Sequence, residues 1–154
     1  MLAGWQAGAW LVAANNSAQT TASMRDEALR EARALIVPLE SIDYRNPDEA
    51  LDRRESLATG SLLAQFQSTR SRYADQIRQT QATTTATVVD AAVTDLDTSG
   101  ETASVLLFVD LSTTQHKDGQ QSGQSTQRQR LKLQITRTDD GWKASQADSV
   151  GSGS

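Results

Sequence analysis

The spacing of apolar residues changes once along this chain, near Thr80, and that change limits the folds open to it. Before Thr80, apolar residues recur at intervals of three and four, as they do on one face of an α-helix. After Thr80, β-branched and apolar residues form short alternating runs separated by turns that contain Gly and Asp, which is typical of antiparallel strands. Helices followed by strands predict a segregated α+β fold rather than a parallel α/β sheet.

Three helices are expected in the N-terminal half. The first covers residues 18–38, because one apolar stripe runs along it, made by Met24, Ala28, Ala32, Leu35, Ile36 and Leu39. Pro38 should end or kink this helix, since it lacks an amide proton and its ring clashes with the preceding turn. The second helix starts at Asn46-Pro47, a capping residue followed by a proline suited to the first helical position, and ends near residue 58. The third covers residues 61–79.

Four strands are expected in the C-terminal half, over residues 83–93, 103–111, 128–136 and 142–147. The second is apolar on both faces, so we expect it to lie in the centre of the sheet and to be covered on both sides. Residues 116–126 are rich in Gly, Gln and Ser, and we expect them to form a polar loop, the most mobile internal segment. The prediction is therefore three N-terminal helices packed on the concave face of a curled four-stranded antiparallel sheet, which can leave a cone-shaped cavity.

The composition excludes several classes of function. The 154 residues suit one domain, and the hydrophobic share of 37% requires a core of Leu, Val, Ile and Ala, because aromatics make up only 5%. The net charge is −4 and no basic stripe is present, which disfavours nucleic acid as a partner. The absence of cysteine excludes disulfides and thiolate metal sites.

The N-terminal residues 1–17 form a separate hydrophobic segment, which is uncharged and apolar over residues 2–14 except for Gln6. A membrane-spanning helix needs about 20 apolar residues, so this run is short for one. Three interpretations stay open: the outer half of a signal anchor, a hydrophobic arm that packs on a partner or on its own domain, and an atypical signal peptide. Trp5 and Trp10 fit a membrane–water interface, where indoles are favoured. The remaining chain divides into one domain over 18–149 and a flexible tail over 150–154.

No set of catalytic residues, cofactor motif or metal-ligand spacing is apparent. The one histidine, His116, falls in the expected polar loop, where nothing orients it as a catalytic base. Asp90 and Asp110 lie in otherwise apolar strands, and a carboxylate buried there would have the raised pKa of a general base. We favour the alternative that both face solvent or cap the end of a strand, because no second acid or base accompanies them.

The tripeptide Asp43-Tyr44-Arg45 joins the first two helices. In a structural role, Tyr44 covers the core between two helices, and Arg45 binds Asp43 or the last carbonyls of the first helix. In a functional role, the same three residues form the rim of a pocket or a contact with a partner. The sequence leaves both roles open.

Four segments together resemble the actinobacterial Mce-associated membrane proteins: IDYRNPDEALDR at 42–53, LATGSLLAQF at 57–66, SVLLFVDLSTT at 104–114 and DDGWKAS at 139–145. The resemblance covers most of the chain, and it rests on the order and spacing of these segments. It implies one N-terminal transmembrane helix and a cone-shaped extracytoplasmic domain of the cystatin-like, ketosteroid-isomerase-like type. It also implies association with Mce lipid-import machines.

These expectations combine into one functional hypothesis: a non-enzymatic accessory or scaffold protein, anchored by a single pass in the cytoplasmic membrane, that supports an Mce-type lipid import system. Its expected partners are envelope proteins, Mce transporter subunits above all, with a lipid as a further candidate. Two alternatives remain, a small ketosteroid-isomerase-like enzyme or apolar-ligand-binding protein, and a scaffold component of a type IV secretion system. Fold alone cannot separate them, because one fold serves many functions.

Overall fold

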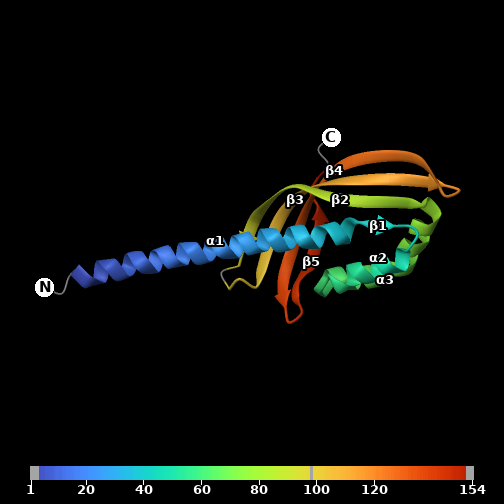
Figure 1. The fold of residues 1–154 in the computed structure, drawn as a ribbon. Helices are drawn as coiled ribbons and strands as arrows, with labels where there is room; N and C mark the ends of the chain where they lie inside the picture. The colour runs from blue at the N-terminus through green and yellow to red at the C-terminus, as the bar shows by residue number, and fades with distance from the viewer. Residues whose placement is uncertain (1–3, 98, 152–154) are drawn as a thin grey trace.

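The computed structural model describes residues 4–97 and 99–151, with side chains described from residue 18 onward. Within these residues the chain forms α1 (Gly4–Glu40), β1 (Ile42–Asp43), α2 (Pro47–Ser56), α3 (Gly60–Thr80), β2 (Ala82–Leu96), β3 (Thr102–Lys117), β4 (Gln120–Thr138) and β5 (Gly141–Ser149). The helices lie together on one side of a single sheet (Figure 1). The predicted α+β class is confirmed.

The sheet is an antiparallel meander in the order β1-β2-β3-β4-β5. The sequence predicted four strands, and the structure adds β1, in which Ile42 pairs with Thr84 and Asp43 with Thr83. Two residues are too few to show an alternating pattern, which is why the sequence did not reveal this strand.

The sheet curls around α1, and interruptions of the strand register accompany the curl. The pairing of β2 with β3 shifts between Val88 and Asp90 and again between Val93 and Asp95, and that of β4 with β5 shifts beside Ile135. Such bulges bend a strand and increase its twist. The result is a concave face along which α1 runs, while the N-terminal part of α1 projects beyond the strands (Figure 1).

The core forms where the apolar stripe of α1 meets the inner residues of the strands. Five α1 residues are buried there against residues of β2, β3, β4 and β5 and against two residues of the α2–α3 segment. The set comprises Ala28, Ala32, Leu35, Ile36, Leu39, Ala58, Leu62, Ala86, Ala103, Val105, Leu107, Val109, Leu131, Leu133, Ile135 and Ala144. Among the described residues, no polar or charged residue is fully buried, so the concave face is filled by hydrocarbon.

The boundaries of the helices follow the predicted signals with two differences. Helix α1 ends at Glu40, two residues past Pro38, which lies in its last turn. Pro47 is the first residue of α2 as expected, but the side chain of Asn46 makes no capping hydrogen bond. Gly60 takes a φ of +59° where the chain turns from α2 into α3, a conformation that glycine reaches without steric cost.

The prediction of a polar loop at residues 116–126 is wrong. Strand β3 continues to Lys117, β4 begins at Gln120, and Asp118 and Gly119 form the turn with φ values of +54° and +79°. Positive φ at both central residues is the geometry that closes a two-residue hairpin. The ribbon carries Gln, Ser and Thr without apolar alternation because most of its residues are exposed on both faces. An alternating pattern marks a strand only where one face is buried.

Strand β3 lies in the centre of the sheet as predicted, but it is covered on one face only. Val105, Leu107 and Val109 are buried beneath α1, whereas Leu106 and Phe108 lie half-buried on the outer face. The expectation of cover on both sides is therefore wrong, since all three helices occupy the concave side (Figure 1).

Candidate functional site

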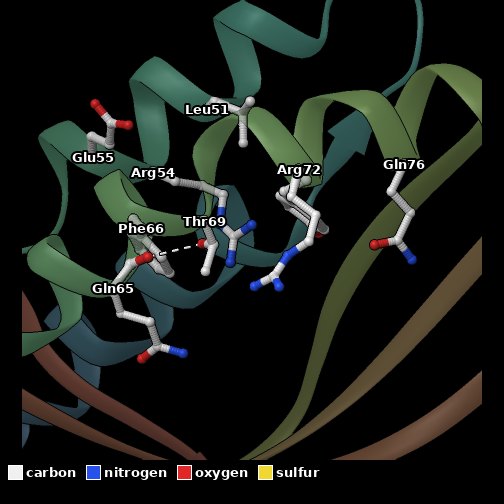
Figure 2. A pocket seen from close by; sticks show the side chains of 9 residues that line it. Leu51, Arg54, Glu55, Gln65, Phe66, Thr69, Arg72 and Gln76 are labelled. Atoms are coloured by element: carbon white, nitrogen blue, oxygen red, sulfur yellow. Dashed lines mark hydrogen bonds between the residues drawn. The ribbon is translucent and has the colours of Figure 1, made fainter.

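A pocket of about 290 Å³ opens between α2 and α3 (Figure 2). Its walls combine apolar and aromatic side chains with cationic and amide groups. The lining residues are Leu51, Arg54, Glu55, Gln65, Phe66, Thr69, Arg72, Tyr73 and Gln76. The mixture of an apolar wall with a few polar groups is the composition expected of a small-molecule site.

Arg54 is the most constrained charged group in this pocket. Its guanidinium carbon lies 4.3 Å from the centroid of the Phe66 ring and 4.8 Å from that of Tyr73. Both distances are within the range of cation–π attraction, which stabilises the planar cation between the rings. The Nε of Arg54 is buried and has no hydrogen-bond partner among the described residues.

Arg72 reaches the same space from α3. Figure 2 shows the guanidinium groups of Arg54 and Arg72 directed toward the middle of the pocket. Arg72 is exposed and forms no ion pair with any described residue. A position on the solvent-facing side of α3 accounts for the exposure of Arg72 but not for the direction of its guanidinium (Figure 2).

The one carboxylate on the lining, that of Glu55, is engaged outside the pocket. It points away from the two pocket arginines in Figure 2, and its Oε1 accepts a hydrogen bond of 3.0 Å from Arg70. The Nη2 of Arg70 also lies 2.8 Å from Asp52 Oδ1, and the hydrogen bonds that Arg70 donates to both carboxylates raise its pKa. The positive charge of Arg54 and Arg72 is therefore not neutralised by Glu55.

A second carboxylate, that of Glu40, faces Arg54 from the end of α1. Burial raises the pKa of Glu40, and the positive charge of Arg54 opposes that rise. No ion pair within 4.0 Å forms between the two groups. Glu40 is thus a partly desolvated acid that feels the charge of Arg54 but does not line the pocket.

The two carboxylates considered as general bases lie elsewhere. Asp90 is exposed, and its Oδ1 accepts a hydrogen bond of 2.8 Å from the amide of Ala91. Asp110 binds Arg128 through two hydrogen bonds of 2.7 and 3.0 Å, which lower the pKa of its carboxyl. A lowered pKa is the opposite of what a general base requires at neutral pH, and neither residue lines the α2–α3 pocket.

His116 lies in β3 rather than in a loop. Its ring packs against Tyr44 with the centroids 5.1 Å apart, and its Nδ1 is buried without a hydrogen-bond partner among the described residues. No carboxylate orients it. The described part of the chain also contains no group of three His, Cys, Asp or Glu side chains placed to hold a metal ion.

The tripeptide Asp43-Tyr44-Arg45 takes the structural arrangement considered above. Asp43 Oδ1 accepts a hydrogen bond of 3.0 Å from the amide of Arg45 and lies 3.6 Å from its guanidinium. Tyr44 packs on a small apolar cluster with Leu51 and Tyr73, which also line the pocket. The tripeptide thus adjoins the pocket residues, although none of its three members is part of the lining. Its role as a rim or partner contact stays a prediction.

The side chains of Trp5 and Trp10 lie outside the described residues, although the backbone at both positions belongs to α1. No helix in the described part of the chain contains a stretch long and apolar enough to cross a membrane. The expected role of the two indoles at a membrane interface therefore stays a prediction.

Sequence reasoning missed Arg54, Phe66 and Arg72 as site residues. The spacings of seven and three between Phe66, Tyr73 and Gln76 predict that these three side chains share one face of α3. The sequence could not show that α2 packs beside α3. This packing places Arg54 against Phe66 and Tyr73.

A family model described as "Uncharacterized protein Rv1363c/MT1408-like" matches residues 2–151. The chain belongs to this family. The match spans both the N-terminal hydrophobic segment and the cone-shaped domain, so the two occur together in the family's pattern. No curated protein sequence matches the chain.

Several solved structures share the fold. The periplasmic domain of DotI has a TM-score of 0.63 and 15% identity, with 81% of this chain and 94% of that chain covered. CagV from Helicobacter pylori strain 26695, a VirB8 homologue of a type IV secretion system, has a TM-score of 0.61 and 10% identity, with 80% and 95% covered. An IcmL-like type IV secretion system protein from Legionella pneumophila strain Philadelphia 1 has a TM-score of 0.60 and 11% identity, with 84% and 96% covered.

At these identities the similarity establishes the fold alone. Nearly the whole of each solved chain is covered, so the likeness extends over a complete domain rather than one motif. The cone-shaped α+β fold expected from the sequence is thereby confirmed.

Proposed function

We propose that this protein is a non-enzymatic accessory or scaffold protein of the cell envelope, anchored at the cytoplasmic membrane through its N-terminal end with the cone domain on the extracytoplasmic side. The observation that carries the proposal is the continuity of α1. One 37-residue helix, about 55 Å long, fills the concave face of the sheet and runs on into the hydrophobic N-terminal segment.

The placement of the α1 side chains supports an anchoring role for its N-terminal part. Residues 18–23 are exposed, and contact with the domain core begins near Met24 and is complete at Ala28. Among the residues whose side chains are described, the contacts of α1 with the core therefore begin near Met24. The apolar run at residues 2–14 that precedes them is a candidate for contact with a membrane or a partner.

The absence of convergent chemistry in the described residues supports a role without turnover. The concave face, where enzymes of the ketosteroid-isomerase type hold their substrates, is filled by α1, Leu107, Leu133 and their neighbours. Asp90 and Asp110 lie away from it. Among the described residues, the enzymatic alternative therefore has no buried carboxylate on the concave face to act as base.

The partner class is the finer part of the proposal. The resemblance of four segments to the Mce-associated membrane proteins favours subunits of an Mce-type lipid import system. The likeness of the fold to DotI, CagV and the IcmL-like protein favours a secretion-system scaffold as the second candidate. Both candidates share an envelope protein complex as the partner.

Affinity capture from native membranes tests the proposal. The tagged protein is expressed in its own host, membranes are solubilised in mild detergent, and co-captured proteins are identified by mass spectrometry. We expect the protein in the membrane fraction, released by detergent and not by high salt, together with Mce subunits. Recovery of secretion-system subunits instead would favour the second candidate. A protein found only in the soluble fraction, with no envelope component bound, would exclude both.

A variant lacking residues 2–17 separates anchoring from folding. We expect it to leave the membrane fraction while keeping the thermal unfolding midpoint of the domain, because the core contacts of the described side chains begin near residue 24. The matched control replaces Leu107 with Ala, which destabilises the domain but leaves the anchor intact.

A further inference from the structure

The α2–α3 pocket holds cationic groups that form no ion pair with any described residue. Two guanidiniums, those of Arg54 and Arg72, reach into it, and the only lining carboxylate, Glu55, is hydrogen-bonded to Arg70 outside it. The chain as a whole carries a net charge of −4, so the positive charge of this pocket is opposite in sign to the net charge of the protein.

Arg54 is preorganised for an anion. The Phe66 and Tyr73 rings hold its guanidinium at 4.3 and 4.8 Å, which fixes the plane of the group before any ligand arrives. A planar guanidinium binds carboxylate and phosphate oxygens through parallel N–H donors, and a fixed plane lowers the entropy lost on binding. The Nε of Arg54 is buried and has no hydrogen-bond partner among the described residues, so a ligand would be held by the remaining N–H groups of the guanidinium.

The walls next to the two guanidiniums are apolar. Leu51, Phe66 and Tyr73 supply hydrocarbon and aromatic surface, while Gln65 and Gln76 carry amide groups that can donate hydrogen bonds. The volume of about 290 Å³ lies at the lower end of the range for small-molecule sites, about 300–1,000 Å³. The pocket therefore suits an anionic group that carries a short apolar chain.

Glu40, the partly buried acid on which the charge of Arg54 acts, does not fill the place of a bound anion. Glu40 faces Arg54 from α1 but forms no ion pair with it within 4.0 Å. The guanidinium consequently keeps its hydrogen-bonding edge for another acceptor.

We propose that the pocket between α2 and α3 binds a small amphiphilic anion, whose carboxylate or phosphate group is held by Arg54 and Arg72 and whose apolar chain lies against Leu51, Phe66 and Tyr73. The site is independent of the scaffold role proposed above. Loss of anion binding leaves membrane anchoring and partner capture unchanged, so the two proposals fail separately.

Titration calorimetry on the full chain tests the site with five probes: octanoate, octyl phosphate, acetate, inorganic phosphate and 1-octanol. We expect octanoate or octyl phosphate to bind one molecule per chain, and the tighter of the two identifies the head group. Acetate and inorganic phosphate lack the apolar chain and octanol lacks the charge, so each should bind at least about tenfold more weakly.

Substitutions locate the binding. Arg72→Gln and Arg54→Gln should each weaken octanoate or octyl phosphate binding by about tenfold or more, because each removes a charge-assisted hydrogen bond. Arg72 is exposed, so its variant should fold even if Arg54→Gln does not. Arg33→Gln is the matched control, since Arg33 is an exposed arginine on α1 outside the pocket. Its variant should bind like the wild type.

Three results would overturn the proposal. The first is that neither octanoate nor octyl phosphate binds. The second is that octanol binds as tightly as either, which would show that charge plays no part. The third is equal weakening by Arg72→Gln and Arg33→Gln, which would show general electrostatic attraction instead of a site.

Discussion

The indole Nε1 of Trp142 donates a hydrogen bond of 3.1 Å to Glu27 Oε1 and so joins the last strand to the first helix. The same carboxylate accepts two hydrogen bonds of 3.2 Å from Arg137, whose guanidinium lies 4.9 Å from the Trp142 ring. Residues from α1, β4 and β5 thus meet at one half-buried carboxylate. This contact fixes α1 against the far edge of the sheet.

Glu27→Ala should lower the free energy of unfolding by about 1–2 kcal/mol, because it removes a half-buried indole hydrogen bond and a partly exposed ion pair. Glu27→Gln should cost less, since its amide oxygen can still accept the indole proton. Urea unfolding followed by far-UV circular dichroism measures both. Asp26→Ala, at the neighbouring exposed position, is the control. Equal effects at positions 26 and 27 would contradict the role of this contact.

The two faces of β3 should differ sharply in their tolerance of substitution. Leu107 is fully buried under α1, and Leu107→Ala should cost about 2–5 kcal/mol through lost burial and the cavity left behind. Leu106 lies half-buried on the outer face, and Leu106→Ala should cost about 1 kcal/mol or less. Thermal and urea unfolding of the two variants compare neighbouring residues of identical chemistry. A large cost at Leu106 would indicate that a partner or a second copy covers the outer face.

A close approach of the β2–β3 turn to α1 gives a coupled pair. Gly100 has a φ of +73°, and a Cβ added there would lie 2.8 Å from the Sδ of Met24. Gly100→Ala should therefore destabilise the domain by about 1–2 kcal/mol from backbone strain alone, with a further cost from the clash. Met24→Ala should remove the cost of the clash, because it takes away the sulfur atom that the added Cβ would meet. A double-mutant cycle should show a coupling energy of about 0.5 kcal/mol or more, and strict additivity would contradict the contact.

The sequence predicted the parts of this fold in which one face is buried. The stripe from Ala28 to Leu39 indicated the core face of α1, and the alternation around Leu131–Ile135 indicated the buried face of β4. It failed where no face is buried, in the ribbon of residues 116–126, because a strand exposed on both sides carries no pattern. It also failed at the pocket, because Arg54 and Phe66 belong to different helices and only their packing brings them together.

Glu40 gives the domain a pH dependence of opposite sign to that of Asp110. Burial raises the pKa of Glu40 in the folded state, so between its usual value and the raised value the folded chain binds more protons than the unfolded one. Stability contributed by the protonated acid is therefore fully present below the unfolded pKa and is lost as pH rises through the folded pKa. Asp110 acts in the other direction, since Arg128 lowers the pKa of its carboxyl and its contribution is lost as pH falls.

Glu40→Gln removes the titrating group while keeping the shape of the side chain. As pH rises from about 4 to 7, the free energy of unfolding should fall less for the variant than for the wild type. The variant should therefore become more stable relative to the wild type as pH rises. Urea unfolding at several pH values measures this difference. Glu49→Gln, at an exposed position of α2, is the control for removing one carboxylate from the surface. If the curve of Glu40→Gln ran parallel to that of the wild type, burial would not raise the pKa of Glu40 in the folded protein, and attraction to Arg54 would then offset the cost of its burial.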